Sequence, residues 1–135
     1  MSKYMNLIGQ NARKASLEKI NTKVKNKILK RYASLLDKER NSIINENTKD
    51  IKFALKKGLK NNLIDRLSIN HEKLDNIKNS INKIIKLKDP VDNTLDKWSR
   101  PNGLKIKRVS IPIGVIGVIY ESRPNVTSDV ASLCF

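Results

Sequence analysis

The stretch that decides the fold is residues 111–134, which read IPIGVIGVIYESRPNVTSDVASLC. Its first part, Ile113–Tyr120, is a continuous apolar run rich in β-branched residues. Such a run predicts a strand that is buried on both faces of a parallel sheet. The polar turn Glu121–Asn125 follows, and the residues from Val126 to Phe135 predict the start of a helix. The stretch therefore predicts one strand–helix unit of an α/β protein.

Upstream of this unit, residues 1 to about 89 show helical periodicity. We expect a first helix over about Lys3–Ser16. A long second helix is predicted from about Ile20 to Asn47, because its apolar residues recur at steps of three and four. Thr22 or Asn21 is placed to cap the start of that second helix.

Three shorter helical segments are predicted next. Asn47 or Thr48 is expected to cap a short third helix, and Gly58 stands where a glycine would end it. Leu63–Leu67 predicts one further turn. Ser68 or Asn70 is expected to open a fourth helix, which Asp89-Pro90 ends because the residue before a proline disfavours the helical conformation.

A β-hairpin is predicted between the helices and the apolar run. Pro101-Asn102-Gly103 lies between Leu95–Arg100 and Leu104–Ile111, and Asn-Gly can supply the positive φ angles of a tight turn. The alternation of apolar residues changes parity at Val109. A β-bulge or a change of packing partner would explain that change.

A strand buried on both faces needs neighbouring strands and covering helices, and the 135 residues offer none after Phe135. We therefore expect this chain to be the opening part of a longer α/β protein.

The formal charge of +15 suggests binding to nucleic acid, but composition offers another explanation. The chain has 21 Lys and only 7 Arg, together with 17 Ile and 16 Asn. Lys, Asn and Ile all have A/T-rich codons, so a skewed genome would raise them together, whereas a nucleic-acid surface has no reason to raise Ile. A small basic helical protein that binds RNA or DNA is the alternative function, and no sequence-specific nucleic-acid partner is expected.

Several classes of protein conflict with the composition. A single Cys and a single His are incompatible with a disulfide framework, a Cys-rich metal site or a His-paired metal motif, so no metal is expected. The run Ile113–Tyr120 is far shorter than the roughly 20 residues of a membrane span, and the start of the chain has no secretory signal. We expect a cytoplasmic protein with no membrane partner.

The candidate site follows from the predicted sheet. Ligands of open α/β sheets bind at the carboxyl ends of the strands, which is where Tyr120–Asn125 falls. Arg123 could hold a carboxylate or phosphate through its planar guanidinium, and Asn125 could donate its amide N–H to a developing oxyanion. Two simpler interpretations stay open: Asn125 as a helix cap, and Arg123 as a member of a surface ion pair.

Two longer motifs carry a resemblance to a known family. They are Trp98-Ser-Arg-Pro-Asn-Gly-Leu and the run from Ile111 to Cys134, which includes Tyr-Glu-Ser-Arg-Pro-Asn-Val-Thr. Asp65-Arg66-Leu67 and Asp89-Pro90-Val91 add to them. With these motifs the chain resembles the gamma-glutamyl phosphate reductases, also called glutamate-5-semialdehyde dehydrogenases, of the aldehyde dehydrogenase superfamily.

The resemblance implies a reaction and a cofactor. Members of the family reduce L-glutamyl 5-phosphate with NADPH to L-glutamate 5-semialdehyde in proline biosynthesis. A cysteine thiolate displaces phosphate, and hydride from NADPH reduces the resulting thioester. Cys134 does not match the nucleophile's motif, so we expect this chain alone to lack the catalytic cysteine and to be inactive.

The resemblance also implies an architecture. Residues 1–93 correspond to the N-terminal helical part of the cofactor-binding domain, and residues 94–112 to the hairpin of an oligomerisation flap. Residues 113–135 correspond to the first strand and helix start of an aldehyde-dehydrogenase-like Rossmann domain. A homo-oligomer formed through the hairpin is the expected assembly of the full-length enzyme.

Site residues carry over from the family as well. Asn125 matches an Asn that helps to form the oxyanion hole, which makes it the expected catalytic residue. Tyr120, Glu121, Ser122 and Arg123 match residues that line the nicotinamide side of the cofactor. General aldehyde dehydrogenases have Pro-Trp-Asn at this turn, whereas this chain has Arg123-Pro124-Asn125. Arginine suits an anionic acyl phosphate better than a neutral aldehyde.

Overall fold

The computed structural model describes residues 3–121 and 123–135, which fall into two compact units. One unit contains residues 20–87 and 118–135, and the other contains residues up to 19 together with 88–117. Helices dominate, and the strands of the described residues form one two-stranded sheet. No helix among the described residues has both the length and the hydropathy to cross a membrane.

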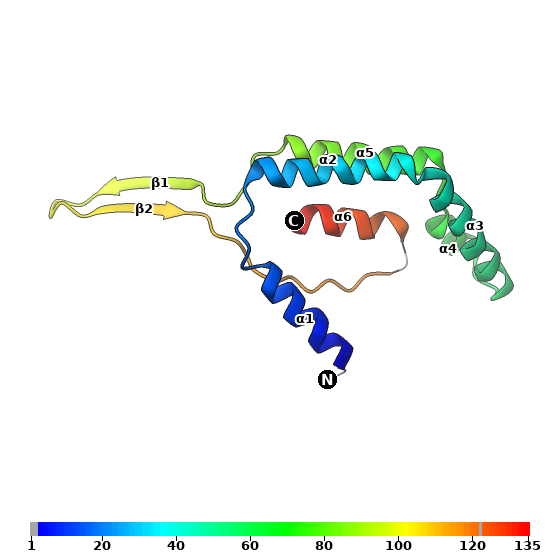
Figure 1. The fold of residues 1–135 in the computed structure, drawn as a ribbon. Helices are drawn as coiled ribbons and strands as arrows, with labels where there is room; N and C mark the ends of the chain where they lie inside the picture. Colours follow the sequence, from blue (N-terminus) through cyan, green and yellow to red (C-terminus); the bar gives the residue numbers. More distant parts are fainter. Residues whose placement is uncertain (1–2, 122) are drawn as a thin grey trace. The chain divides into compact units, whose positions relative to one another are not determined.

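The larger unit is built on two long helices, α2 (Thr22–Lys38) and α5 (His71–Lys86), which lie side by side (Figure 1). Leu74, Ile77 and Ile81 follow helical spacing along α5 and are buried. They pack with Leu29 and Ala33 of α2 to form the core. Burial of each such aliphatic side chain contributes on the order of 1.5–3 kcal/mol, so this seam supplies most of the unit's hydrophobic stabilisation.

Asparagine side chains begin both of these helices. Asn21 accepts a hydrogen bond from the N–H of Val24 at 3.0 Å, and Asn70 accepts one from the N–H of Lys73 at 2.8 Å. Each bond satisfies a backbone donor that the first turn leaves without a partner. Asn21 and Asn70, which were two of the alternatives expected from the sequence, are confirmed as the caps.

The predicted second helix is wrong in its extent. It ends at Lys38, and after Glu39 the chain turns into α3 (Arg40–Lys56). No glycine or proline marks this break in the sequence. Arg40 instead binds three groups at the break: the Asp37 carboxylate at 2.8 Å, the Asp75 carboxylate at 2.5 Å and the carbonyl of His71 at 3.1 Å. The bonds to Asp75 and His71 of α5 are long-range, so local periodicity gives no signal of them.

The cap predicted at Asn47 or Thr48 is also wrong, because α3 continues through both residues. Asn47 is buried, and its amide bridges the link between α4 (Asn61–Leu67) and α5. Its Nδ2 donates to the carbonyl of Leu67 at 2.9 Å, and its Oδ1 accepts from the N–H of Ile69 at 2.6 Å. One side chain therefore satisfies two backbone groups of an irregular segment.

Gly58 ends α3 as expected. Its φ of +73° lies in the left-handed region, which a glycine adopts at little cost. The N–H of Gly58 donates to the carbonyl of Leu55, and the N–H of Leu59 donates to that of Ala54. This pair of bonds is a complete Schellman motif.

The smaller unit contains α1 (Lys3–Ala15), β1 (Thr94–Ser99) and β2 (Lys105–Val109). The strands run antiparallel as a ribbon (Figure 1), with Ser99 opposite Lys105 and Trp98 opposite Ile106. The strand pairing shifts register between Thr94 and Asp96, opposite Val109, which agrees with a β-bulge as the explanation of the parity change there.

The hairpin turn differs in one respect from the expectation. The N–H of Gly103 donates to the carbonyl of Arg100, and Gly103 has a φ of +84°, but Asn102 does not adopt a positive φ. Pro101 holds the first turn position near −65°, which suits a three-residue turn with glycine last.

The predicted strand Ile113–Tyr120 does not form in the described residues, where residues 111–121 carry no strand pairing. A strand exists through hydrogen bonds to a neighbour, and β1 and β2 pair only with each other. Ile113 is 91% exposed and Ile119 is fully exposed. The apolar run therefore has no burial partner among the described residues.

We predict that Asn47→Ala lowers the free energy of unfolding by about 1–3 kcal/mol, because it leaves two buried backbone groups without partners. Urea unfolding of the chain measures the loss. Asn45→Ala on the exposed side of α3 is the matched control and should change little. Equal stabilities of the two variants would contradict the bridging role of Asn47.

We also predict that the ion pairs of Asp37 weaken in acid. Hydrogen bonds from Lys78 and then from Arg40 lower the pKa of Asp37 below its ordinary value of 3.8. A lowered folded-state pKa stabilises the fold above the unfolded pKa, and this stabilisation is lost as the pH falls below about 3.8 through the folded pKa.

The measurement is urea unfolding of the wild type and Asp37→Asn at pH 7 and at successively lower pH. Asp37→Asn should be the less stable at pH 7, and the difference should narrow below pH 4. Asp50→Asn removes the same charge from the exposed face of α3 and should leave stability at pH 7 nearly unchanged. A constant difference between wild type and Asp37→Asn would contradict the ion-pair argument.

Candidate functional site

The candidate site lies at the start of α6 (Pro124–Cys134). Pro124 begins the helix, where its missing N–H costs no hydrogen bond. Arg123 occupies the N-cap position with extended φ and ψ of −93° and 120°, and its side chain makes no capping bond. Asn125 is thus the second residue of the helix, and its interpretation as a helix cap is wrong.

The Asn125 side chain has a different partner. Its Nδ2 donates to Oδ2 of Asp129 at 3.1 Å, one helical turn further on. Residues four apart share a face of a helix, so the spacing allows this contact. Asn125 is exposed and Asp129 is half-buried, which leaves the carboxamide open to a ligand.

Arg123 and Glu121 form an ion pair. Arg123 Nη2 lies 2.7 Å from Glu121 Oε1, and Arg66 Nη1 approaches the same oxygen at 3.8 Å. The surface ion pair expected as one alternative for Arg123 is therefore present. All three side chains are 40–55% exposed, so solvent screens these contacts and their contribution to stability is small. Arg123 Nε is buried and has no partner among the described residues.

Tyr120 is tied to α6. Its hydroxyl lies 3.0 Å from Oγ1 of Thr127, so a hydrogen bond joins the segment before the turn to the first turns of the helix. Ser122, the remaining residue expected on the nicotinamide side, lies outside the described residues.

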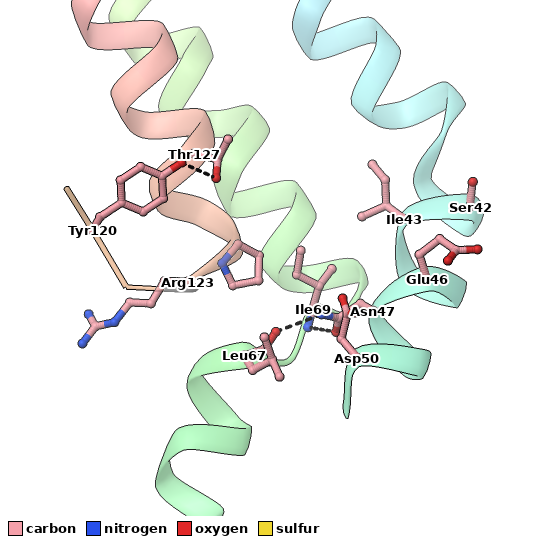
Figure 2. Close-up of a pocket in the computed structure, with 11 residues that line it drawn as sticks. Ser42, Ile43, Glu46, Asn47, Asp50, Leu67, Ile69, Tyr120, Arg123 and Thr127 are labelled. Atoms are coloured by element: carbon pink, nitrogen blue, oxygen red, sulfur yellow. Dashed lines mark hydrogen bonds between the residues drawn. The ribbon is translucent and has the colours of Figure 1, made fainter. Parts of the chain in front are cut away.

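A cavity of about 480 Å³ lies beside Tyr120 and Arg123. It is bounded by one face of α3, by the α4–α5 link and by the start of α6 (Figure 2). The Arg123 guanidinium extends away from the α3 side of this cavity (Figure 2). The lining residues are Ser42, Ile43, Glu46, Asn47, Asp50, Leu67, Ile69, Tyr120, Arg123, Pro124 and Thr127.

The structure brings together part of the expected set. Tyr120 and Arg123 line the cavity, whereas Glu121 and Asn125 do not. Among the described residues no group of three or more His, Cys, Asp or Glu side chains is placed to hold a metal ion.

Two polar contacts of the site were missed by the sequence argument. The partnership of Asp129 with Asn125 could have been found from the four-residue spacing. The approach of Arg66 to Glu121 has no local signal, because 55 residues separate them; only the resemblance of Asp65-Arg66-Leu67 to the family marked Arg66.

Comparisons with known proteins identify the relatives of this chain. No family model matches it. Curated gamma-glutamyl phosphate reductases do match: that of Nautilia profundicola is 50% identical over 116 residues, which cover 86% of this chain and 28% of the relative. The reductase of Geobacillus kaustophilus is 44% identical over 119 residues, which cover 88% of this chain and 29% of the relative.

Solved structures lead to the same enzyme. The chain superposes on gamma-glutamyl phosphate reductase of Thermotoga maritima with a TM-score of 0.87 and 42% identity, covering 92% of this chain and 30% of that one. For the Saccharomyces cerevisiae enzyme the TM-score is 0.89 and the identity 31%, covering 98% of this chain and 34% of that one.

The fold of this chain thus matches one segment of an oxidoreductase. The chain is a homologue of the gamma-glutamyl phosphate reductases, which are enzymes of proline biosynthesis, and the resemblance inferred from its motifs is confirmed. It spans about a third or less of the length of these relatives.

Proposed function

We propose that this chain acts as the N-terminal part of a cytoplasmic reductase that converts L-glutamyl 5-phosphate to L-glutamate 5-semialdehyde and phosphate, with NADPH as the reductant. The observation that carries the proposal is the turn at the start of α6. Arg123 and Asn125 are both accessible there, within a segment that is 50% identical to a curated reductase. The catalytic thiolate is assigned to a part of the enzyme beyond this chain.

The role proposed for Asn125 follows from the charge that develops in the reaction. When a thiolate attacks the acyl phosphate, a C–S bond forms and the carbonyl oxygen takes up the electron pair of the C=O bond. A neutral N–H held beside that oxygen stabilises it more in the transition state than in the ground state. The tetrahedral intermediate then expels phosphate, and the carbonyl of the thioester forms.

Arg123 is proposed to bind the anionic end of the substrate. Its guanidinium already engages one carboxylate oxygen of Glu121, and Arg66 approaches the same oxygen. A planar guanidinium also matches the geometry of a phosphate group. A substrate phosphate that takes the place of the Glu121 carboxylate would meet both guanidinium groups, which would stabilise its growing negative charge as it departs.

The cofactor residues fit a nicotinamide in part. Tyr120 offers a half-exposed aromatic ring, and Arg123 Nε is a buried donor without a partner among the described residues. That donor could bind the carboxamide of a nicotinamide, and the ring could pack against its flat face. NADPH, when bound, supplies the hydride that reduces the thioester. Tyr120, Glu121 and Ser122 remain proposed contacts.

Homo-oligomer formation through the hairpin is part of the proposal. Leu95, Trp98, Leu104 and Val109 of the hairpin region are all at least 40% exposed. A lone two-stranded hairpin is marginal in water, so covering this apolar surface would stabilise the strands. The similarity to reductases favours the enzyme over the alternative function in nucleic-acid binding.

We predict that the isolated chain has no reductase activity, because the proposed thiolate is absent and an unpaired apolar run cannot preorganise an oxyanion site. Oxidation of NADPH with glutamyl phosphate, and reduction of NADP with glutamate semialdehyde, are the assays. The full-length gene should restore growth without proline to a bacterium that lacks the reductase, and the gene segment for residues 1–135 alone should not. Failure of the full-length gene to restore growth would overturn the proposed function.

We further predict that Asn125→Ala in the full-length reductase lowers kcat by about 10²–10³, with little change in KM, which is the cost of losing one oxyanion donor. Asn125→Asp should be at least as harmful, because it offers no N–H and adds a negative charge beside Asp129. A purely structural role through the contact with Asp129 would cost only a few tenths of a kcal/mol of helix stability. An active Asn125→Asp enzyme would remove Asn125 from the mechanism.

A further inference from the structure

Asp129 accepts the hydrogen bond that orients the Asn125 side chain. Its Oδ2 lies 3.1 Å from Nδ2 of Asn125, and both residues belong to α6, so the contact depends only on the helix. Because the two residues are four positions apart, their side chains extend from the same face in successive turns. No long-range contact is needed to bring them together.

Asn125 and Asp129 lie on a different face of α6 from the residues that pack against α5. Ser128 and Ser132 are buried, and α6 packs against α5. Asn125 is exposed and Asp129 half-buried. The pair is therefore held by a helix that is anchored through other residues, and it remains accessible to a ligand.

A carboxamide has two orientations that differ by exchange of its oxygen and nitrogen, and packing alone separates them poorly. A carboxylate accepts hydrogen bonds and donates none. The flipped orientation of Asn125 would place its carbonyl oxygen against the Asp129 carboxylate, where the two oxygens repel. Asp129 therefore selects the orientation in which the NH₂ group lies on its side.

The NH₂ group has two N–H bonds, and Asp129 accepts one of them. Among the described residues no other atom accepts from Asn125 Nδ2, so its second N–H is available for a developing oxyanion. We propose that Asp129 is a positioning residue for the reduction of glutamyl phosphate: it holds the Asn125 carboxamide with an N–H directed at the reacting carbonyl oxygen. This inference rests on the proposed function, in which Asn125 is the oxyanion donor.

The arrangement has an expected kinetic consequence. A donor held in place before the reaction needs no reorientation when charge develops, so its fixation lowers the barrier and leaves substrate affinity almost unaltered. Asp129 also brings a negative charge near the site, which opposes a second negative charge on the oxyanion. Its benefit must therefore act through Asn125 and should vanish when Asn125 is absent.

The test is a double-mutant cycle in the full-length reductase. Asp129→Ala should lower kcat about 10- to 100-fold with KM little changed, as expected for a misplaced catalytic group. Asp129→Asn keeps an oxygen that can accept the hydrogen bond and should recover most of the loss. In the Asn125→Ala background, Asp129→Ala should cause no further loss, because its effect acts through a side chain that is already missing. Glu72→Ala, an exposed carboxylate at the start of α5, is the control and should leave kcat unchanged.

The outcomes separate this inference from the proposed function. If the Asp129→Ala and Asn125→Ala losses multiply in the double variant, Asp129 acts independently and the inference is overturned, while the role of Asn125 stands. Wild-type activity of Asp129→Ala also overturns it. If Asn125→Ala itself keeps wild-type kcat, the oxyanion role fails first. Thermal melts of all variants show whether a loss of kcat comes from unfolding of α6, which would equally count against a positioning role.

Discussion

The packing of α5 against α2 is the contact on which the larger unit depends. Leu74 and Ile81 of α5 are the most completely buried large side chains among the described residues, and Leu29 of α2 packs with them. Other elements of the unit are attached to α5. Arg40 joins the start of α3 to it through Asp75, and α6 packs along it. A change in the position of α5 would therefore move the walls of the cavity and the start of α6 together.

The candidate site is partly organised by this framework. Asn47, which lines the cavity, holds the α4–α5 link, and Tyr120 is hydrogen-bonded to Thr127. Arg123 Nη2, by contrast, pairs with Glu121, a neighbouring side chain that is itself half exposed to solvent. The helix thus holds Asn125 and Asp129 through its own geometry, whereas the guanidinium has an exchangeable partner that an anionic substrate could replace.

Two exposed apolar surfaces show which contacts this chain does not supply by itself. The hairpin pairs its own strands but buries almost none of their side chains. The run from Ile113 to Tyr120 has neither pairing nor burial. Hydrophobic surface of this kind is stabilised when another layer covers it, which agrees with a chain that spans about a third or less of its relatives.

The sequence by itself determined the elements whose signals are local: the glycine stop at Gly58, the hairpin around Gly103 and the helix after the Arg123-Pro124 turn. It narrowed each of two helix caps to a pair of residues, from which the structure selects Asn21 and Asn70. It also determined the family, because a run as long as Tyr120–Thr127 is distinctive. The domain boundaries at residues 93 and 112 and the roles of the site residues stay predictions.

Only the tertiary structure decided the break at Glu39, the bridge from Asn47 and the convergence of Arg66 and Arg123 on Glu121. Periodicity reports which face of a helix is apolar, whereas these features depend on polar groups that meet across long stretches of chain. The strand predicted at residues 113–120 is absent because it also depends on distant contacts. Its residues favour an extended strand, but a strand forms only when a neighbouring strand provides the hydrogen bonds.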